Sequence, residues 1–473
     1  MLNNTLDTGA PGDEDLHIVG TNRSQILIKA FLLGLIIRGA IETGGGIFPV
    51  GYDPSTYYVL MCACWRWDYV LSAPLYSVFL LCLYLIIGNA LIAVKIGSVF
   101  VSGLFTFSMA YWAKKNNIPE EHILSFVTFT YTFFVVLRVL WDLHRNVVGI
   151  SLAFLALAFY KENKKGWAFV FSFLSGLAHP LSLVFLGALV IHDLIRIGRE
   201  ALSVGLGVSL GVGAIVILKV VVNDFSVWRV VQSYWYVTRG QLPVYILWLF
   251  SPLIPIIVLA IHERRRLLSE LLYDMTYSRL VVWVSIILMA SFILKYTYRI
   301  VFLAAFPLAI LTFRLAEASN WSKKALRILI IYNVIVSAFY PAVFYIHPIQ
   351  ESFRRTHPPA LIAGNMFPDQ EYAAKSLFEE ALRFLDEHSV IIIHHSEISY
   401  AYAAGVPLCS NNTMITGPDD GFDRYLDLAN DMRFKAAYIV WYLEAPVGSV
   451  RAPAGGEVIE SLCGLALYRY SLS

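Results

Sequence analysis

The sequence predicts a membrane all-α polytopic bundle of about eleven transmembrane helices and a small C-terminal α/β domain outside the membrane. Of the 473 residues, 58% are hydrophobic and 15% are charged, whereas a soluble domain carries about 25% charged residues. Apolar runs recur from residue 24 to residue 345, and the tail after them is polar. A net charge of +2 gives no support for nucleic-acid binding.

Each predicted transmembrane helix is an apolar run, and a spanning helix needs about 20 residues, or fewer where Lys or Arg flank it. Residues 1–23 are polar and resemble no cleavable signal peptide, so they predict a cytoplasmic tail before a retained anchor. Pro180 predicts a turn or kink between two short runs. The predicted spans are 24–41, 90–112, 122–140, 146–160, 166–179, 181–196, 201–221, 243–261, 278–295, 300–314 and 325–345.

The segment 74–87 is also apolar enough to span, and the distribution of positive charge decides its placement. If it lies along the outer surface, nearly every Lys/Arg cluster falls on one face, which the positive-inside rule requires. These clusters are Lys114-Lys115, Lys161–Lys165, Arg196–Arg199, Arg264–Arg266 and Lys323-Lys324. The rule predicts a multi-pass plasma-membrane protein with an inside N-terminus. The expected outer parts are 42–89, 141–145, 222–242, 295–299 and the tail.

The tail, residues 346–473, alternates helix and strand patterns, which predicts an α/β domain. Helices are expected at Asp369–His388 and Phe422–Met432, and strands at Val390–Ile393, Ala437–Tyr442 and Leu465–Tyr470. Five cysteines are too few for a disulfide framework. Cys409 and Cys463 either pair outside the membrane or remain small buried thiols.

The glycine-rich stretch from Arg38 to Tyr58 follows the first span and carries two carboxylates, Glu42 and Asp53. An aromatic cluster that includes Tyr57 and Tyr58 suits a bilayer interface. Ionisable groups at membrane depth are functional candidates. A carboxylate can act as a general base on a hydroxyl, and Arg can bind phosphate. Further candidates on the predicted outer side are Asp142, His144, Arg145, His179, Lys295, Tyr298 and Arg299.

Each candidate also has a purely structural interpretation. Asp53 before Pro54 can initiate a turn. Asp142 and Arg145 can form a solvated pair, and Glu42 can form a helix-end pair with Arg38. His179 can be a packed or capping residue, and Arg299 an interfacial side chain. Their predicted co-location on one face favours function over these interpretations.

The layout resembles the GT-C superfamily of integral membrane glycosyltransferases that use polyprenyl-phosphate sugars. Ala73-Pro74-Leu75-Tyr76 is similar to the Pro-Pro-Leu-Tyr element of that family, with one Pro fewer. The other resembling elements, in chain order, are Arg38, Gly51-Tyr52-Asp53, Tyr57-Tyr58, Asp142-Leu143-His144-Arg145-Asn146, Gly176-Leu177-Ala178-His179-Pro180, Tyr298-Arg299 and Pro307. The resemblance covers residues 24–345 and includes an outer C-terminal domain, and the combination resembles archaeal members.

The resemblance implies that Asp53 is the acceptor-activating base or a metal ligand and that Asp142 assists it. It implies that Arg299 contacts the donor phosphate, and Lys295, Tyr298, Arg145 and His179 are candidates to assist it. A divalent metal (Mg or Mn) held by Asp53, Asp142 and His144 is a further expectation.

The tail lacks the Trp-Trp-Asp-Tyr-Gly motif of oligosaccharyltransferases. The resemblance therefore implies a hexosyltransferase of the dolichyl-phosphate-mannose-dependent kind, which glycosylates a protein, lipid or glycan. The alternative class is a transporter or flippase for a lipid-linked or amphipathic solute. Against it, no two related halves are visible, and the charges gather at one face and not at mid-depth. A non-catalytic scaffold is a third class and gives the two aspartates no role.

Overall fold

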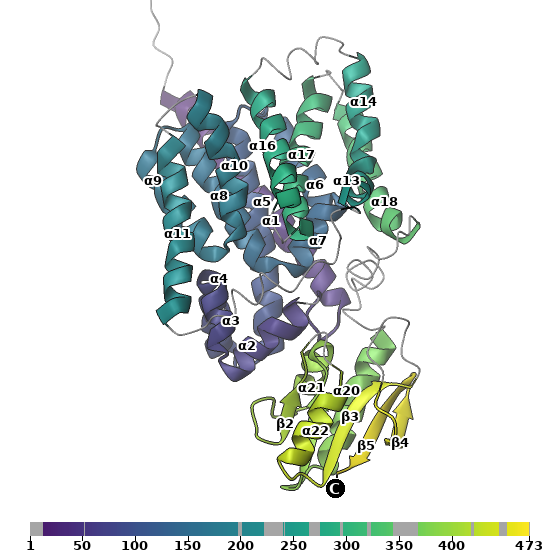
Figure 1. The fold of residues 1–473 in the computed structure, drawn as a ribbon. Helices are drawn as coiled ribbons and strands as arrows, with labels where there is room; N and C mark the ends of the chain where they lie inside the picture. Colours follow the sequence, from purple (N-terminus) through teal and green to yellow (C-terminus); the bar gives the residue numbers. More distant parts are fainter. Residues whose placement is uncertain are drawn as a thin grey trace, which may run out of the picture.

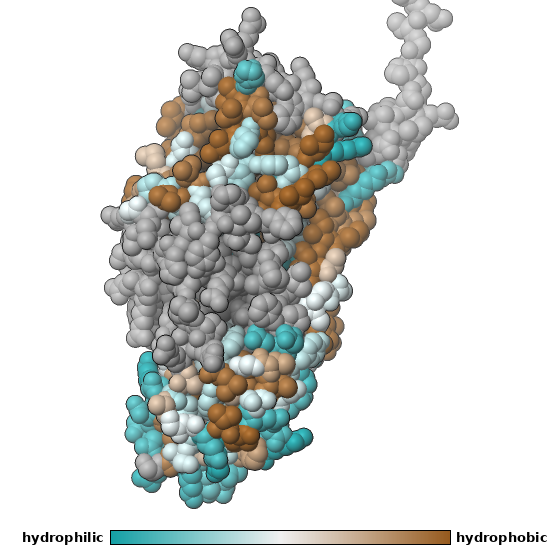
Figure 2. All heavy atoms as spheres, turned by 90° about the vertical axis from the view of Figure 1, so that its right-hand side faces the viewer, coloured by the Kyte–Doolittle hydropathy of each residue, from teal (hydrophilic) through white to brown (hydrophobic). Residues whose placement is uncertain are grey.

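The computed structural model describes residues 13–51, 53–196, 201–221, 240, 242–263, 275–293, 297–318, 323–343, 368–417, 421–443 and 452–472. A helical bundle is followed by an α/β domain, which lies beyond the end of the bundle that carries α2, α3 and α4 (Figure 1). Figure 2 shows hydrophobic residues gathered over the bundle, while hydrophilic residues predominate on the α/β domain. The prediction of a mostly helical chain with a C-terminal α/β region is confirmed.

Each predicted span coincides with one helix or with a broken helix. Within the described part of the chain, four helical segments are long and apolar enough to cross a membrane, or five if one bent pair counts as a span. The predicted eleven spans therefore remain a prediction. The bundle helices are α1 (Asp13–Gly44), α5 (Ala90–Lys115), α6 (Glu120–Thr132), α7 (Phe134–Asp142), α8 (His144–Lys161), α9 (Lys165–Ala178), α10 (Leu181–Arg196), α11 (Leu202–Val221), α13 (Leu242–Phe250), α14 (Ile254–Glu263), α16 (Met275–Ile293), α17 (Thr297–Ala318) and α18 (Lys323–Val343).

The predicted span 122–140 is not one straight helix, because α6 and α7 meet at an angle of 73°. Phe133 between them is extended, with φ −65° and ψ 124°. Two side chains of α18 bind backbone oxygens near the break. Asn333 Nδ2 donates to the Phe129 carbonyl at 2.8 Å, and Ser337 Oγ donates to the Thr132 carbonyl at 2.5 Å. A long-range contact thus stabilises a break that contains no proline.

The predicted outer loop 42–89 is largely helical. Helix α1 continues to Gly44, and the segment then forms a π-helical turn η1 (Pro54–Tyr58), α2 (Val59–Cys64), α3 (Trp67–Ser72) and α4 (Pro74–Ile87). Helix α4 begins at a proline, whose missing N–H costs nothing in the first turn. At 14 residues, α4 is about 21 Å long, shorter than the hydrocarbon core of a bilayer. Length alone does not decide its placement, because the predicted span α9 also has 14 residues.

The C-terminal domain is a five-stranded mixed sheet in the order β2-β1-β3-β5-β4. Strand β1 pairs in parallel with β2 and β3, and β5 pairs antiparallel with β3 and β4. Its elements are α20 (Pro368–Arg383), β1 (Ser389–Ile393), η4 (His395–Glu397), α21 (Ile398–Ala403), β2 (Thr413–Ile415), α22 (Asp423–Asp431), β3 (Ala436–Tyr442), β4 (Glu457–Leu462) and β5 (Leu465–Ser471).

The three predicted strands and two predicted helices of this domain are confirmed, although α20 ends at Arg383, before the predicted His388. Four elements were not predicted, namely η4, α21, β2 and β4. Strand β2 has only three residues, and β4 is a largely exposed edge strand with two glutamates, so neither has the apolar pattern of a buried strand.

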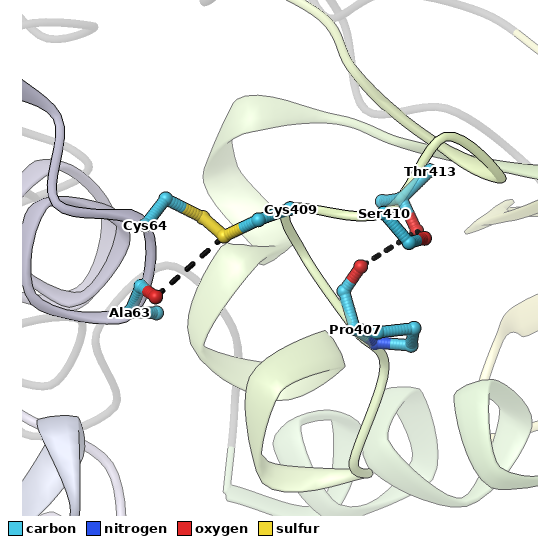
Figure 3. The surroundings of a disulfide bond; sticks show 6 residues. All are labelled: Ala63, Cys64, Pro407, Cys409, Ser410 and Thr413. Atoms are coloured by element: carbon cyan, nitrogen blue, oxygen red, sulfur yellow. Dashed lines mark hydrogen bonds between the residues drawn. A yellow bond between two sulfur atoms is a disulfide. The ribbon is translucent and has the colours of Figure 1, made fainter.

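A disulfide joins Cys64 at the end of α2 to Cys409 in the C-terminal domain (Figure 3). The Cys409 sulfur also lies 3.6 Å from the carbonyl oxygen of Ala63. The predicted pairing of Cys409 with Cys463 is wrong, because Cys463 is a free, exposed thiol. The alternative prediction, that Cys409 and Cys463 are small buried thiols, is also wrong, because Cys409 is disulfide-bonded and Cys463 is exposed. The bond attaches the C-terminal domain to the segment between α1 and α5.

Candidate functional site

The turn between α1 and Asp53 is held by charged side chains of the bundle. Arg38 and Glu42 form a buried ion pair at 2.6 Å. Arg38 Nη2 also donates to the Val50 carbonyl at 2.8 Å, and Val50 N donates to Glu42 Oε2 at 3.1 Å. The predicted helix-end pair is therefore confirmed, and it also binds the turn that leads to Asp53.

Lys95 of α5 caps the same turn. Its ammonium donates to the carbonyl oxygens of Glu42 at 2.5 Å, Gly46 at 2.6 Å and Phe48 at 3.0 Å. These include a carbonyl of the last turn of α1, which has no partner within the helix. A cation at this end also interacts favourably with the helix dipole. The path of the chain toward Asp53 is thus fixed by α1 and α5.

Gly51 lets this turn approach the end of α7. Its φ is +109°, and a Cβ at this position would lie 2.2 Å from the carbonyl oxygen of Trp141. Only glycine fits such a conformation and such a contact. Two residues later, Asp53 N donates to Asp142 Oδ1 at 2.7 Å. The structure therefore brings the first two predicted site segments together, although 89 residues separate the aspartates.

Asp142 uses both carboxylate oxygens within the protein. Oδ1 accepts from the Asp53 backbone, and Oδ2 accepts from Arg138 Nη1 at 2.6 Å. Arg138 and Asp142 lie one turn apart on α7, and both are buried. Pairing of Asp142 with Arg145 in solvent was predicted as an alternative and is wrong. Arg138 was missed, although its i,i+4 spacing from Asp142 is visible in the sequence.

The Asp53 carboxyl is buried and lies among charged groups. Burial raises its pKa to about 7, and the negative charge of Asp142 adds to this effect. Positive charges on Arg299, Arg145 and Arg138 act in the opposite direction. Asp53 precedes η1 but makes no side-chain capping hydrogen bond there. A carboxyl with a pKa near 7 can accept a proton at neutral pH, which suits general-base chemistry.

Tyr58 is the last residue of η1, and its side chain is fully buried. The guanidinium of Arg145 lies 5.8 Å from the centre of its ring. The predicted position of Tyr58 at a bilayer interface is therefore wrong. Its burial raises the pKa of its hydroxyl above the ordinary value. It can donate a hydrogen bond but does not ionise at neutral pH.

His179 lies between α9 and α10 in an extended conformation, as expected before Pro180. Its Nδ1 accepts from Leu181 N at 3.1 Å, so the predicted capping role is confirmed. Positive charges of Arg145, Arg299 and Lys219 act on its ring. Lys219 is buried near the C-terminal end of α11 and was missed. It is the single charged residue in the apolar run 202–221, which is the signal that could have identified it.

The predicted metal ligands Asp53, Asp142 and His144 do not fit a shared ion. His144 Nδ1 lies 3.0 Å from the Tyr76 hydroxyl, and both Asp142 oxygens have donors. No group of three or more His, Cys, Asp or Glu side chains that could hold a metal is found among the described residues. We therefore derive no step that uses a metal ion.

Two predicted donor-binding residues cannot be placed in this site. Lys295 lies outside the described residues, as does most of the predicted outer loop 222–242. Tyr298 lies in the first turn of α17, next to Arg299, but its side chain is outside the described part of the chain. The site as described therefore consists of the two aspartates, the cations around them and Tyr58.

Comparison with known proteins does not assign this site. No protein-family model matches the chain, and no curated protein sequence matches it. The chemistry must therefore be inferred from the side chains themselves. They place one buried carboxyl, which can take up a proton near pH 7, within the electrostatic influence of several cations. This combination suits a reaction that deprotonates one group and releases an anion.

Proposed function

We propose that this protein is a multi-pass membrane glycosyltransferase of the GT-C type. It moves a sugar from a polyprenyl-phosphate donor to an acceptor hydroxyl at the outer membrane face. The observation that carries the proposal is the buried Asp53 carboxyl, next to Asp142 and under the influence of Arg145 and Arg299. The eleven spans, the plasma-membrane location and the outside position of the C-terminal domain are part of this proposal.

In the proposed reaction, Asp53 removes the proton from the acceptor hydroxyl while its oxygen attacks the anomeric carbon of the donor sugar. The bond between that carbon and the phosphate oxygen breaks, and its electron pair stays with the phosphate. Arg299 and Arg145 stabilise the negative charge on the departing polyprenyl phosphate. The products are the glycosylated acceptor and polyprenyl phosphate, and the proton remains on Asp53 until solvent removes it.

Asp142 has a different role in this proposal. Both of its oxygens already accept hydrogen bonds, from Asp53 N and from Arg138. It therefore holds the backbone of Asp53 in place and does not itself receive the acceptor proton. Lys219 extends the positive surroundings toward α11, and His179, whose Nδ1 accepts from Leu181 N, offers its other ring nitrogen as a hydrogen-bond donor. They are assigned to the donor phosphate, together with Lys295 and Tyr298.

The proposed membrane location supports a polyprenyl-phosphate donor. A polyprenyl chain is apolar and partitions into the bilayer, so its phosphate lies near the membrane surface. The resemblance to dolichyl-phosphate-mannose-dependent enzymes favours mannose as the sugar. The acceptor is a hydroxyl on a protein, a lipid or a glycan.

The test uses the full chain in lipid nanodiscs with radiolabelled polyprenyl-phosphate mannose and membranes of the producing cells as the source of acceptors. Wild type should consume the donor, and the label should appear in protein, lipid or glycan. Asp53→Asn should lower this rate by about 10²-fold or more, because the substituted amide cannot take up the proton. Asp427→Asn, which alters an exposed carboxylate on α22, is the matched control and should retain the wild-type rate.

Retention of the wild-type rate by Asp53→Asn would contradict the proposal. A second readout distinguishes the transporter class, since a flippase moves the labelled donor between leaflets and leaves it chemically intact. Movement of intact donor without sugar transfer would therefore favour the transporter over the glycosyltransferase.

A further inference from the structure

The C-terminal domain contacts the chain on both sides of Asp53. Before it, the Phe48 ring packs edge-on against Tyr400 at 4.9 Å and Tyr372 at 5.9 Å between ring centres. After it, the Tyr57 ring in η1 lies 4.3 Å from the ring of His395. Residues from the turn before Asp53 and from η1 are therefore both held by one domain that lies more than 300 residues later.

Two further contacts fix the domain in this position. The disulfide joins Cys64, just after η1, to Cys409. At the start of α5, Ala90 N donates to the Tyr402 hydroxyl at 3.2 Å, which satisfies a helix-terminal donor. Helix α5 also carries Lys95, which binds the Phe48 carbonyl from the bundle side at 3.0 Å. Phe48 is thus held by its backbone on one side and by its ring on the other.

The segment between these contacts includes the short turn η1. Turn η1 has five residues, and no side chain caps its N-terminus. Short π-helical turns have weaker internal hydrogen bonding than α-helices and occur often at functional sites. The Asp53 N–H bond to Asp142 depends on the path of this segment. Tyr57 lies four residues after Asp53, so a change in the position of Tyr57 also changes the position of Asp53.

We propose that the docked C-terminal domain positions Asp53 for the reaction, with His395 and Tyr400 as positioning residues that act through Tyr57 and Phe48. This inference rests on the proposed function for its catalytic consequence. Its structural consequence, an ordered Asp53 segment that depends on His395, holds whatever the reaction is. His395 begins η4 two residues after the end of β1, so the sheet supplies the rigid support.

The environment of His395 agrees with a packing role. The side chain is buried, and burial lowers the pKa of its ring to about 3. The ring is therefore neutral at physiological pH, and an aromatic ring of similar size can replace it. This makes His395→Phe a conservative variant that keeps the contact with Tyr57, whereas His395→Ala removes it.

The test measures hydrogen–deuterium exchange of the full chain in lipid nanodiscs. In His395→Ala, the peptide covering residues 53–59 should exchange at least about fivefold faster than in wild type. His395→Phe should restore most of the protection. Leu428→Ala, an exposed position on α22 of the same domain, is the control and should leave this peptide unchanged.

The same variants are then assayed for sugar transfer. His395→Ala should lower kcat about tenfold with little change in the donor KM, because the base is misplaced while the donor site remains. The acid limb of the pH profile should move to lower pH, because a loosened Asp53 is better solvated and its pKa falls. A role in folding alone would not move this limb.

Unchanged exchange of residues 53–59 in His395→Ala would overturn the inference, even if Asp53→Asn abolishes transfer and the proposed function stands. Faster exchange together with no transfer by wild type would refute the proposed function alone. An unchanged kcat and acid limb despite faster exchange would overturn the positioning role.

Discussion

Arg138 and Asp142 illustrate how one buried residue determines the role of another. The carboxylate of Asp142 is fully engaged, by a backbone N–H at 2.7 Å and by a guanidinium at 2.6 Å. An acid in that position supports its neighbour through these two hydrogen bonds. Asp53 differs because its pKa is raised to about 7. Two aspartates of identical chemistry thus receive different tasks from their surroundings.

Replacing Arg138 tests this division. Arg138→Met removes the partner of a buried charge, which typically costs about 3–5 kcal/mol. The variant should therefore unfold at a clearly lower temperature in a fluorescence melting experiment. The double variant Arg138→Met with Asp142→Asn should recover part of the loss, because the unpaired charge is removed as well. Equal melting temperatures for Arg138→Met and wild type would show that the pair is not formed.

At the residue scale, the sequence was informative about which carboxylates matter and less so about their partners. Asp53 and Asp142 were identified because charge is rare beside apolar runs. Arg138 and Lys219 were missed because each lies inside a predicted span, where a cation was interpreted as part of a helix. Their contacts with the site depend on how α7 and α11 pack, which no local pattern specifies.

At the element scale, helices were predicted well because a long apolar run has few alternatives. The break at His179-Pro180 was also predicted, since proline acts locally. The break at Phe133 was not, because the residues that satisfy its carbonyls are on α18, about 200 residues away. The predicted outer loop also proved to be largely helical. Its glycines end α1 but do not prevent new helices from forming after Asp53.

Helix α20 contributes a buried carboxyl to the contact between the C-terminal domain and the bundle. Burial raises the pKa of Glu371 to about 8, opposed by a hydrogen bond from the Tyr400 hydroxyl and by the charge of Lys95. The unfolded chain has an ordinary pKa for this group, about 4.3. The folded state thus binds the proton more tightly, and between these two values stability falls as pH rises.

The melting temperature should therefore decrease as pH rises from about 5 to about 9, and Glu371→Gln should flatten part of this decrease. Glu397 remains in that variant, and burial also raises its pKa, so some pH dependence should persist. Glu379→Gln on the exposed side of α20 is the control. A wild-type melting temperature that rises over this range would contradict the assigned protonation of Glu371.

At the scale of the whole molecule, the C-terminal domain lies against the end of the bundle that carries α2, α3 and α4 (Figure 1). The disulfide and the ring contacts hold it against η1 and α2. The bond requires an oxidising compartment, which agrees with the predicted outside location of both partners. Its connectivity was not predictable, because cysteine spacing alone does not determine which thiols meet. Charge asymmetry between loops predicted only that both cysteines lie on the same side.

The most direct measurement of the central claim is the pH dependence of the transfer rate at saturating donor, from pH 5 to 9. If Asp53 is the general base, the rate should rise about tenfold per pH unit in the acid range and level off above the pKa. That pKa should lie near 7, the value to which burial raises Asp53. Wild type that transfers at the same rate throughout this range, or Asp53→Asn with an unaltered profile, would contradict the account.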